Sequence, residues 1–288
     1  MDINFNYLIS SSDRIDESYD IKGRPDPDSA SKKLCDDIIL VYLTGGVIAD
    51  KGLTVENFEQ QYQFDHKSDW NRQWENYEKV NKNPKPRDKT LQPPFYTIRV
   101  KEGKETKWLL SADYIGPSIN WALKEVENGV LSNDDVIGIL NTCRTIGGHI
   151  VWPRGSCLAH KINTSRGGEK AVFDRIDWTL YLVKLCYKYD FDVSAISKII
   201  LETYQREVYC RTYGLIHAVC EVEDWFKEFG SFENFCNQFI LRGSFVDEKY
   251  EIKWFANQLP VFPEDYKQFL INNTEAVNKR NQNICLAD

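Results

Sequence analysis

Residues 140–180 read LNTCRTIGGHIVWPRGSCLAHKINTSRGGEKAVFDRIDWTL, and the elements of the fold can be traced outward from this stretch. It leads from a helix-like segment through Gly147-Gly148 into an extended segment, then through a polar, glycine-rich loop into a second helix-like segment. The window 142–184 holds seven basic and three acidic side chains, so it carries +4, whereas the whole chain carries −7. A positive island in an acidic protein concentrates anions such as phosphates.

The flanking segments predict a mainly α fold with a small β element, an α+β chain. Apolar side chains recur every three or four residues in several ranges, which indicates helices. We expect them over 54–80, 115–129, 132–148, 176–189, 193–230 (as one helix or two), 231–241, and from near Pro263 to 282. The runs 95–100 and 107–112 flank a charged turn with a central glycine, which predicts a β-hairpin. Residues 150–152 predict a further extended segment, which Pro153 ends.

Residues 81–94 mark the clearest break, because their four prolines prevent a helix and favour an exposed connection. We therefore expect residues 1–94 to form an N-terminal extension that wraps the remainder. Residues 95–288 are expected to form one compact, mainly helical core domain with the hairpin and the basic motif region. A chain of 288 residues is long enough to bury a substantial core.

Several protein classes are disfavoured by composition. The longest apolar run, at 38–43, is far shorter than the roughly 20 residues that span a bilayer. The first 20 residues lack the basic and then apolar pattern of a signal peptide. The eight cysteines include no CxxC pair, which argues against a zinc knuckle or a thioredoxin-type site. We expect a cytoplasmic protein with reduced thiols, no membrane contact, no metal and no cofactor.

Arg144 and His149 form the first candidate pair for chemistry. With the preceding Leu-Asn, their R-x4-H spacing resembles the signature of HEPN-type ribonucleases, helical proteins that use an Arg and a His, usually from both protomers of a dimer, to cut RNA without a metal. An imidazole can move the protons and a guanidinium can hold the phosphate. Thr145 and Gly147-Gly148 depart from that signature. The alternative is a structural histidine at a helix end, with Arg144 interacting with the helix dipole.

The loop at 162–168, INTSRGG, is the second candidate. Arg166 offers a guanidinium, and Gly167 with the following glycine can present backbone N–H groups, a combination that suits an anion. Asn163 can add a hydrogen bond. A tight turn without a ligand explains the same residues equally well.

The segment 173–180, FDRIDWTL, is the third candidate. Asp174 and Asp177 are three residues apart, so both carboxylates are expected on one face at a helix N-terminus, with Arg175 pointing elsewhere. In the functional interpretation, one carboxylate orients a basic group of the site. In the structural interpretation, the carboxylates accept hydrogen bonds from free N–H groups of the first turn.

Three motifs give the chain a resemblance to an uncharacterised bacterial and prophage family: GGHIxxPR at 147–154, INxxRG at 162–167 and DR(I/F)DxTL at 174–180. The resemblance is continuous from about residue 110 to residue 187 and weaker beyond. The occurrence of this family in mobile elements implies a role in phage–host conflict and antiviral defence. In that setting an RNA-cleaving, toxin-like activity fits, as does a nucleotide-using enzyme or a non-catalytic sensor.

The leading hypothesis is therefore a phage–host conflict enzyme, a metal-independent endoribonuclease or nucleotide-processing enzyme, with RNA or a phosphorylated nucleotide as partner and a homodimer as one arrangement. The alternatives are a non-catalytic module that senses phosphate, nucleotides or nucleic acid, and a structural interaction protein. The predicted site residues have three roles: catalysis by His149, Arg144 and Asp177, substrate or phosphate binding by Arg154, Asn163, Arg166, Gly167 and Arg175, and orientation of the basic groups by Asp174.

Overall fold

The computed structural model describes residues 62–64, 97–102, 104–115, 125–143, 145–153, 175–204, 206–255 and 266–285. Helices make up most of these residues, and the strands form one antiparallel sheet in the order β1-β2-β3-β4. The predicted mainly α fold with a small β element is therefore confirmed.

The sheet is built on the predicted hairpin. Strands β2 (Thr97–Glu102) and β3 (Glu105–Tyr114) pair antiparallel across the charged turn, and β4 (His149–Pro153) pairs with β3, as the extended segment at 150–152 predicts. Strand β1 (Tyr62–Phe64) pairs with β2, so the N-terminal 94 residues contribute a strand to this sheet. The prediction of a helix at 62–64 is wrong. An aromatic, polar, aromatic alternation also fits the period of a strand, and pairing with β2 satisfies the backbone groups that a helix would bond internally.

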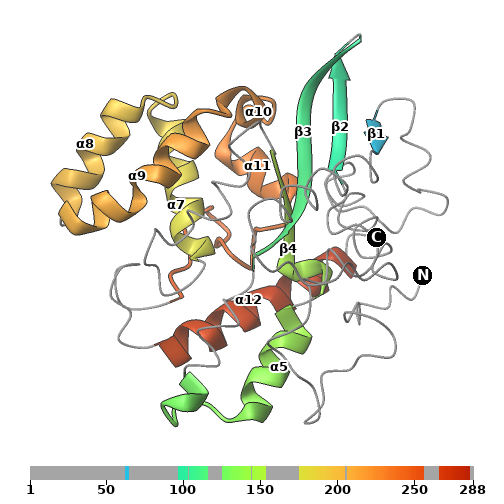
Figure 1. Ribbon diagram of the computed structural model, residues 1–288, viewed down its shortest axis with the longest axis vertical. Helices are drawn as coiled ribbons and strands as arrows, with labels where there is room; N and C mark the ends of the chain where they lie inside the picture. The colour runs from blue at the N-terminus through green and yellow to red at the C-terminus, as the bar shows by residue number, and fades with distance from the viewer. Residues whose placement is uncertain are drawn as a thin grey trace, which may run out of the picture.

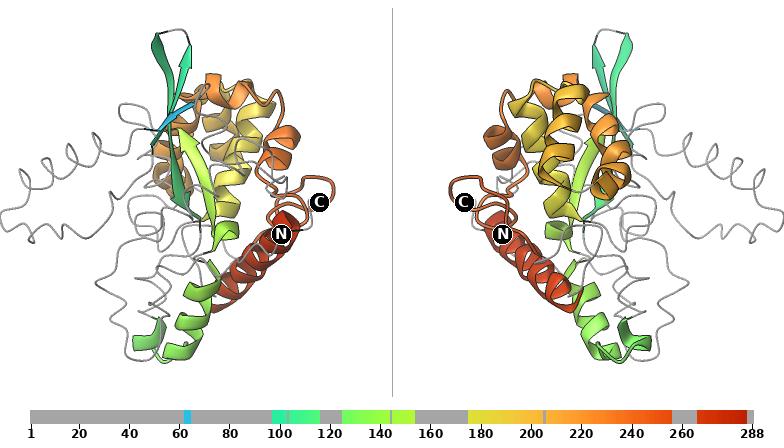
Figure 2. Two further views of the ribbon diagram at one scale, coloured as in Figure 1. Left: turned by 90° about the vertical axis from the view of Figure 1, so that its right-hand side faces the viewer. Right: turned by 90° about the vertical axis from the view of Figure 1, so that its left-hand side faces the viewer.

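Helices follow the predicted ranges closely, but their ends differ. The range 193–230 forms three helices rather than one or two, because the chain leaves helical geometry at Tyr204 and again at 221–222. Helices α7 to α11 lie on one face of the sheet, and α5 and α12 extend below it in the view of Figure 1 (Figures 1 and 2). The bounds are α5 (Asn133–Cys143), α7 (Ile176–Lys188), α8 (Val193–Thr203), α9 (Arg206–Cys220), α10 (Glu223–Lys227), α11 (Phe232–Gln238) and α12 (Tyr266–Cys285).

Helix α5 begins at a reciprocal cap formed by Ser132 and Asp135. The Ser132 hydroxyl accepts the Asp135 N–H at 3.1 Å, and the Ser132 N–H donates to the Asp135 carboxylate at 2.8 Å. Such a box satisfies two backbone donors that have no partner inside the helix. The hydrogen bonds that the Ser132 N–H and hydroxyl donate to the carboxylate lower the pKa of Asp135.

Aromatic side chains fill the space between the sheet and the helices that cover it. Trp152 of β4 is buried, and its ring centroid lies 6.4 Å from Trp225 and Phe226 and 6.2 Å from Phe235. Large buried rings remove much apolar area from water, which drives the packing of these helices on β4.

The Gly147-Gly148 pair is a packing requirement rather than the end of a long helix. Helix α5 ends at Cys143, five residues earlier than predicted, and a separate 3-10 turn, η3 (Ile146–Gly148), follows. A Cβ at Gly148 would lie 1.7 Å from the Cys143 carbonyl oxygen, and one at Gly147 would lie 2.5 Å from Asn281 Oδ1 on α12. The Gly147 N–H donates to that same oxygen at 2.7 Å. Only glycine lets the turn approach both helices this closely.

Substituting Gly147 with alanine is expected to destabilise the fold by about 1–3 kcal/mol, because the added methyl overpacks the contact with α12. Gly138 provides a matched control. It lies inside α5, and a Cβ there would have no heavy atom within 4 Å, so Gly138→Ala should stabilise by about 0.5–1 kcal/mol. Urea denaturation of both variants measures the difference. Midpoint shifts of the same sign would contradict this account of the turn.

Candidate functional site

The structure places three of the nine predicted site residues: His149, Arg175 and Asp177. The other six lie outside the described residues, and their predicted roles stay predictions: Arg144, Arg154, Asn163, Arg166, Gly167 and Asp174.

His149 lies inside the core at the start of β4. The residue is only 1% exposed, and its Nδ1 atom lies 2.8 Å from the Thr145 carbonyl oxygen. The His149 carbonyl oxygen accepts a hydrogen bond from Arg280 of α12. These contacts fit the structural alternative. A catalytic role for the imidazole stays a prediction that requires a conformation in which solvent or substrate can reach the ring.

Arg175 and Asp177 form a fully buried, bidentate ion pair. Arg175 Nε donates to Asp177 Oδ1 and Arg175 Nη2 donates to Asp177 Oδ2, both at 2.7 Å. The expectation that Arg175 points elsewhere is wrong. Arg175 is the N-cap of α7, and its backbone (φ −99°, ψ 87°) lies outside helical geometry, so its side chain can fold back over the first turn to the carboxylate. Burial makes the pairing obligatory, because an unpaired charge in the core is very costly.

The Asp177 carboxylate also fixes the backbone around it. Oδ1 accepts the Trp178 N–H at 2.8 Å within α7, and Oδ2 accepts the Phe255 N–H at 3.0 Å from a segment 78 residues away. The Phe255 carbonyl oxygen in turn accepts Asn272 Nδ2 of α12 at 3.0 Å. Phe255 is therefore tied to α7 on one side and to α12 on the other.

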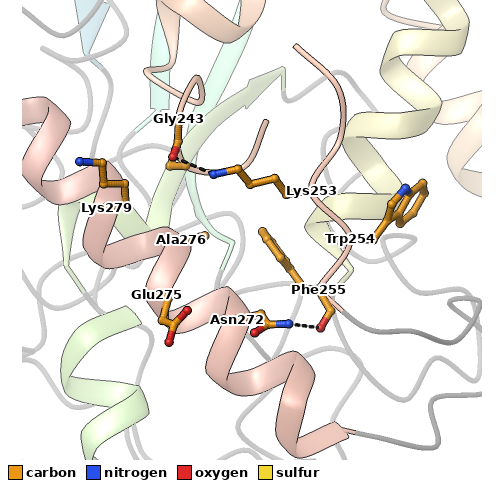
Figure 3. Close-up of a pocket in the computed structure, with 9 residues that line it drawn as sticks. Gly243, Lys253, Trp254, Phe255, Asn272, Glu275, Ala276 and Lys279 are labelled. Carbon is orange, nitrogen blue, oxygen red and sulfur yellow. Dashed lines mark hydrogen bonds between the residues drawn. The ribbon is translucent and has the colours of Figure 1, made fainter. Parts of the chain in front are cut away.

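A hollow of about 350 Å³ opens between residues 253–255 and α12 (Figure 3). Its lining residues come from three stretches of sequence, so the hollow exists only in the folded chain. They are Gly243, Ser244, Lys253, Trp254, Phe255, Asn272, Glu275, Ala276 and Lys279.

The charged groups of the hollow come from both of its walls. Lys253 reaches across from its own segment, and its Nζ atom donates to the Gly243 carbonyl oxygen at 2.9 Å (Figure 3). Lys279 and Glu275 come from α12. Two lysines and one glutamate leave the described lining with a positive balance, which favours an anion.

The wall that carries Lys253 is held before any ligand binds. The Lys253 N–H donates to the Phe245 carbonyl oxygen at 3.1 Å, and Gly243 turns with a φ of +76°, a left-handed angle that suits glycine. Together with the two hydrogen bonds of Phe255, these contacts fix the segment at both ends. A fixed wall lowers the entropic cost of binding.

The residues of the hollow are not among the predicted site residues. Lys253 and Trp254 lie outside the basic window, and Lys279 lies in the expected C-terminal helix. The sequence signal that could have pointed to the hollow is the run Lys253-Trp254-Phe255, in which two aromatic side chains follow a charged one. Arg280 is buried and falls in the same three-to-four-residue register as the apolar side chains of α12. A charged residue at such a position is a second signal, because its charge needs partners inside the fold.

Among the described residues, no group of histidine, cysteine and carboxylate side chains has the arrangement to hold a metal ion. No helix in the same part of the chain has both the length and the apolar content to cross a bilayer.

Fold and hollow together define an α+β protein with a positively charged depression, lined on one side by α12, beside a buried ion pair. A model of a family of unknown function (DUF6994) matches residues 49–209, more than half of the chain, and the chain belongs to that family. This confirms the expected membership in an uncharacterised family. No curated protein and no solved structure gives a significant match. The matched range includes the Arg175–Asp177 pair and ends before the residues that line the hollow.

Proposed function

We propose that the chain binds a phosphate-bearing ligand in the hollow between α12 and residues 253–255. The observation that supports this most strongly is the pair of lysines, Lys253 and Lys279, that line a preformed hollow from opposite walls. Phosphate groups are bound in proteins by such cations and by hydrogen-bond donors.

The chemistry of Lys253 suits this role. An ammonium group has three N–H donors, and the Gly243 carbonyl oxygen occupies one of them. The remaining donors can serve a phosphate oxygen without breaking the contact that positions the side chain. The volume of about 350 Å³ lies at the lower end of the range of ordinary small-ligand sites.

Binding without turnover is the proposal that these observations favour over RNA cleavage. The ribonuclease hypothesis relies on the imidazole of His149 as proton carrier, and that ring is buried against the Thr145 carbonyl oxygen. A binding module in the phage–host setting would act as a sensor of a phosphorylated signal. A cytoplasmic location fits such a ligand, and the five described cysteines fit that location because they form no disulfide among the described residues.

Replacing both lysines by glutamine is expected to weaken the binding of a phosphorylated probe by about tenfold or more, because each charge-assisted hydrogen bond contributes about 1.5–3 kcal/mol. Isothermal titration of the full chain with pyrophosphate and with nucleoside diphosphates measures the change. Lys198→Gln is the matched control, since Lys198 is an exposed lysine of α8 that does not line the hollow. Binding should also weaken as salt is added.

Two outcomes would contradict the proposal. In the first, none of the phosphorylated probes binds the wild-type chain at millimolar concentration. In the second, the double lysine variant binds as tightly as Lys198→Gln. Cleavage of RNA by the purified chain in EDTA, lost in His149→Ala with its melting temperature retained, would instead restore the ribonuclease hypothesis.

A further inference from the structure

We propose that Cys186 and Cys220 form a disulfide when the protein meets a peroxide, so that the pair acts as an oxidation-sensitive lock between helices α7 and α9. The two Sγ atoms lie 3.8 Å apart, although 34 positions separate the residues in sequence. Both residues are buried, and their helices cover the same face of the sheet (Figure 1). This inference is independent of the hollow and of its ligand.

The distance between the two sulfur atoms can be closed by a small local movement. The length of an S–S bond is about 2.05 Å, so the atoms must approach each other by somewhat less than about 2 Å. Cys220 is the last residue of α9, and the chain leaves helical geometry at 221–222. Because the backbone at a helix end is less constrained than in a helix interior, Cys220 can supply this movement.

Cys220 is the thiol of the pair that an oxidant reaches first. This residue is 8% exposed, whereas Cys186 is 0% exposed. The hydrogen bond with Cys220 and burial raise the pKa of the Cys186 thiol, which keeps this thiol protonated and a weak nucleophile toward a peroxide. A small oxidant such as hydrogen peroxide therefore reacts at Cys220, and Cys186 is the residue that resolves the product.

The oxidation takes place in two balanced steps. In the first, the Cys220 sulfur attacks one oxygen of hydrogen peroxide, the O–O bond breaks, and the thiol proton joins the leaving hydroxide, which gives a sulfenic acid and water. In the second, the Cys186 sulfur attacks the Cys220 sulfur, the S–O bond breaks, and the Cys186 proton joins the leaving hydroxide as a second water. Both thiols are oxidised and the peroxide is reduced. Exchange with an added thiol returns the pair to its reduced form.

The test treats the full chain with millimolar hydrogen peroxide and maps its disulfides by mass spectrometry of unreduced peptides. The expected product joins the peptides of Cys186 and Cys220 with the loss of two hydrogen atoms, and dithiothreitol should reverse it. The melting temperature should rise by about 4 °C or more, because a cross-link that closes a long loop restricts the unfolded chain. Both effects should be absent in Cys186→Ala.

Cys236→Ala is the matched control, since Cys236 of α11 is as fully buried as Cys186 and its removal should leave the cross-link intact. The inference would be overturned if Cys186 and Cys220 both remain thiols after the exposed Cys210 is oxidised, or if Cys220 links to another cysteine. A cross-linked chain that melts no higher than the reduced chain would contradict the role as a lock. If Cys186→Ala does not fold, Cys220→Ala and the peptide map of the wild-type chain decide the question.

Discussion

Replacing Arg280 with methionine is expected to lower the free energy of unfolding by about 3 kcal/mol or more, because three buried carbonyl oxygens lose this donor at about 1–3 kcal/mol each, whereas the Ile146 carbonyl keeps the His149 N–H. Arg280 is 1% exposed, and two of its nitrogen atoms serve four carbonyl oxygens. Nε donates to the carbonyl of Phe239 at 2.9 Å. Nη1 contacts the carbonyls of Ile146, Gly147 and His149.

Arg280 joins three parts of the fold through these bonds. It connects α12 to the end of α11, to the turn η3 and to the start of β4. Burial lowers the pKa of its guanidinium, and no carboxylate within the described residues forms an ion pair with it. The carbonyl dipoles therefore provide the compensation that buried charges require. When Arg280 is replaced, these buried carbonyl oxygens lose its hydrogen bonds, and water cannot reach them to take its place.

Urea denaturation followed by circular dichroism measures the effect. Arg242→Met is the matched control, because Arg242 is half exposed and pairs with Glu248 at the surface at 2.9 Å. Exposed pairs of this kind contribute about 0–1 kcal/mol. Arg280→Lys should also destabilise, since a single ammonium cannot span the positions of Nε and Nη1. Equal losses at Arg280 and Arg242 would contradict the role assigned to Arg280.

Replacing Asp177 with leucine is expected to destabilise the fold by about 3–5 kcal/mol, because Arg175 would remain buried with an uncompensated charge. The Phe255 N–H would also lose its acceptor, which lies 3.0 Å away. Since Phe255 forms part of the wall of the hollow, pyrophosphate binding should weaken in the fraction that remains folded. Urea denaturation and titration of the same sample measure the two effects.

A double variant separates the ion pair from its surroundings. Arg175→Met with Asp177→Leu removes both charges, and replacing a whole buried pair by apolar side chains is often close to neutral. The double variant should therefore recover much of the stability that Asp177→Leu loses, although not the hydrogen bonds to Trp178 and Phe255. A double variant as unstable as the single one would show that the charge on Arg175 is not the cause.

The sequence predicts much of the local structure because local structure depends on neighbours in the chain. The apolar period of three to four residues locates α7, α8, α11 and α12, and the charged turn between two alternating runs locates the hairpin. The strand at Tyr62–Phe64 is missed because its partner, β2, lies more than 30 residues away. A three-residue strand has no local signature that could outweigh a helical pattern around it.

The candidate site divides in a similar way. The basic window 142–184 includes Arg175 and Asp177, but spacing alone cannot tell that the two side chains pair with each other in the core. Burial decides this, and burial depends on which distant segment covers a helix end. In this chain that segment includes Phe255, whose N–H donates a hydrogen bond to the Asp177 carboxylate.

By itself, the amino-acid sequence determined the class of fold, most helices, the hairpin and membership in an uncharacterised family, because each depends on patterns within a continuous run of residues. Only the tertiary structure decided that Gly147 and Gly148 serve contact with α5 and α12, and that Arg280 binds four carbonyl oxygens. It alone brought Lys253, Trp254 and Lys279 to one hollow. Such contacts form between residues that are far apart in the chain, because the burial of apolar side chains from several segments brings those segments together.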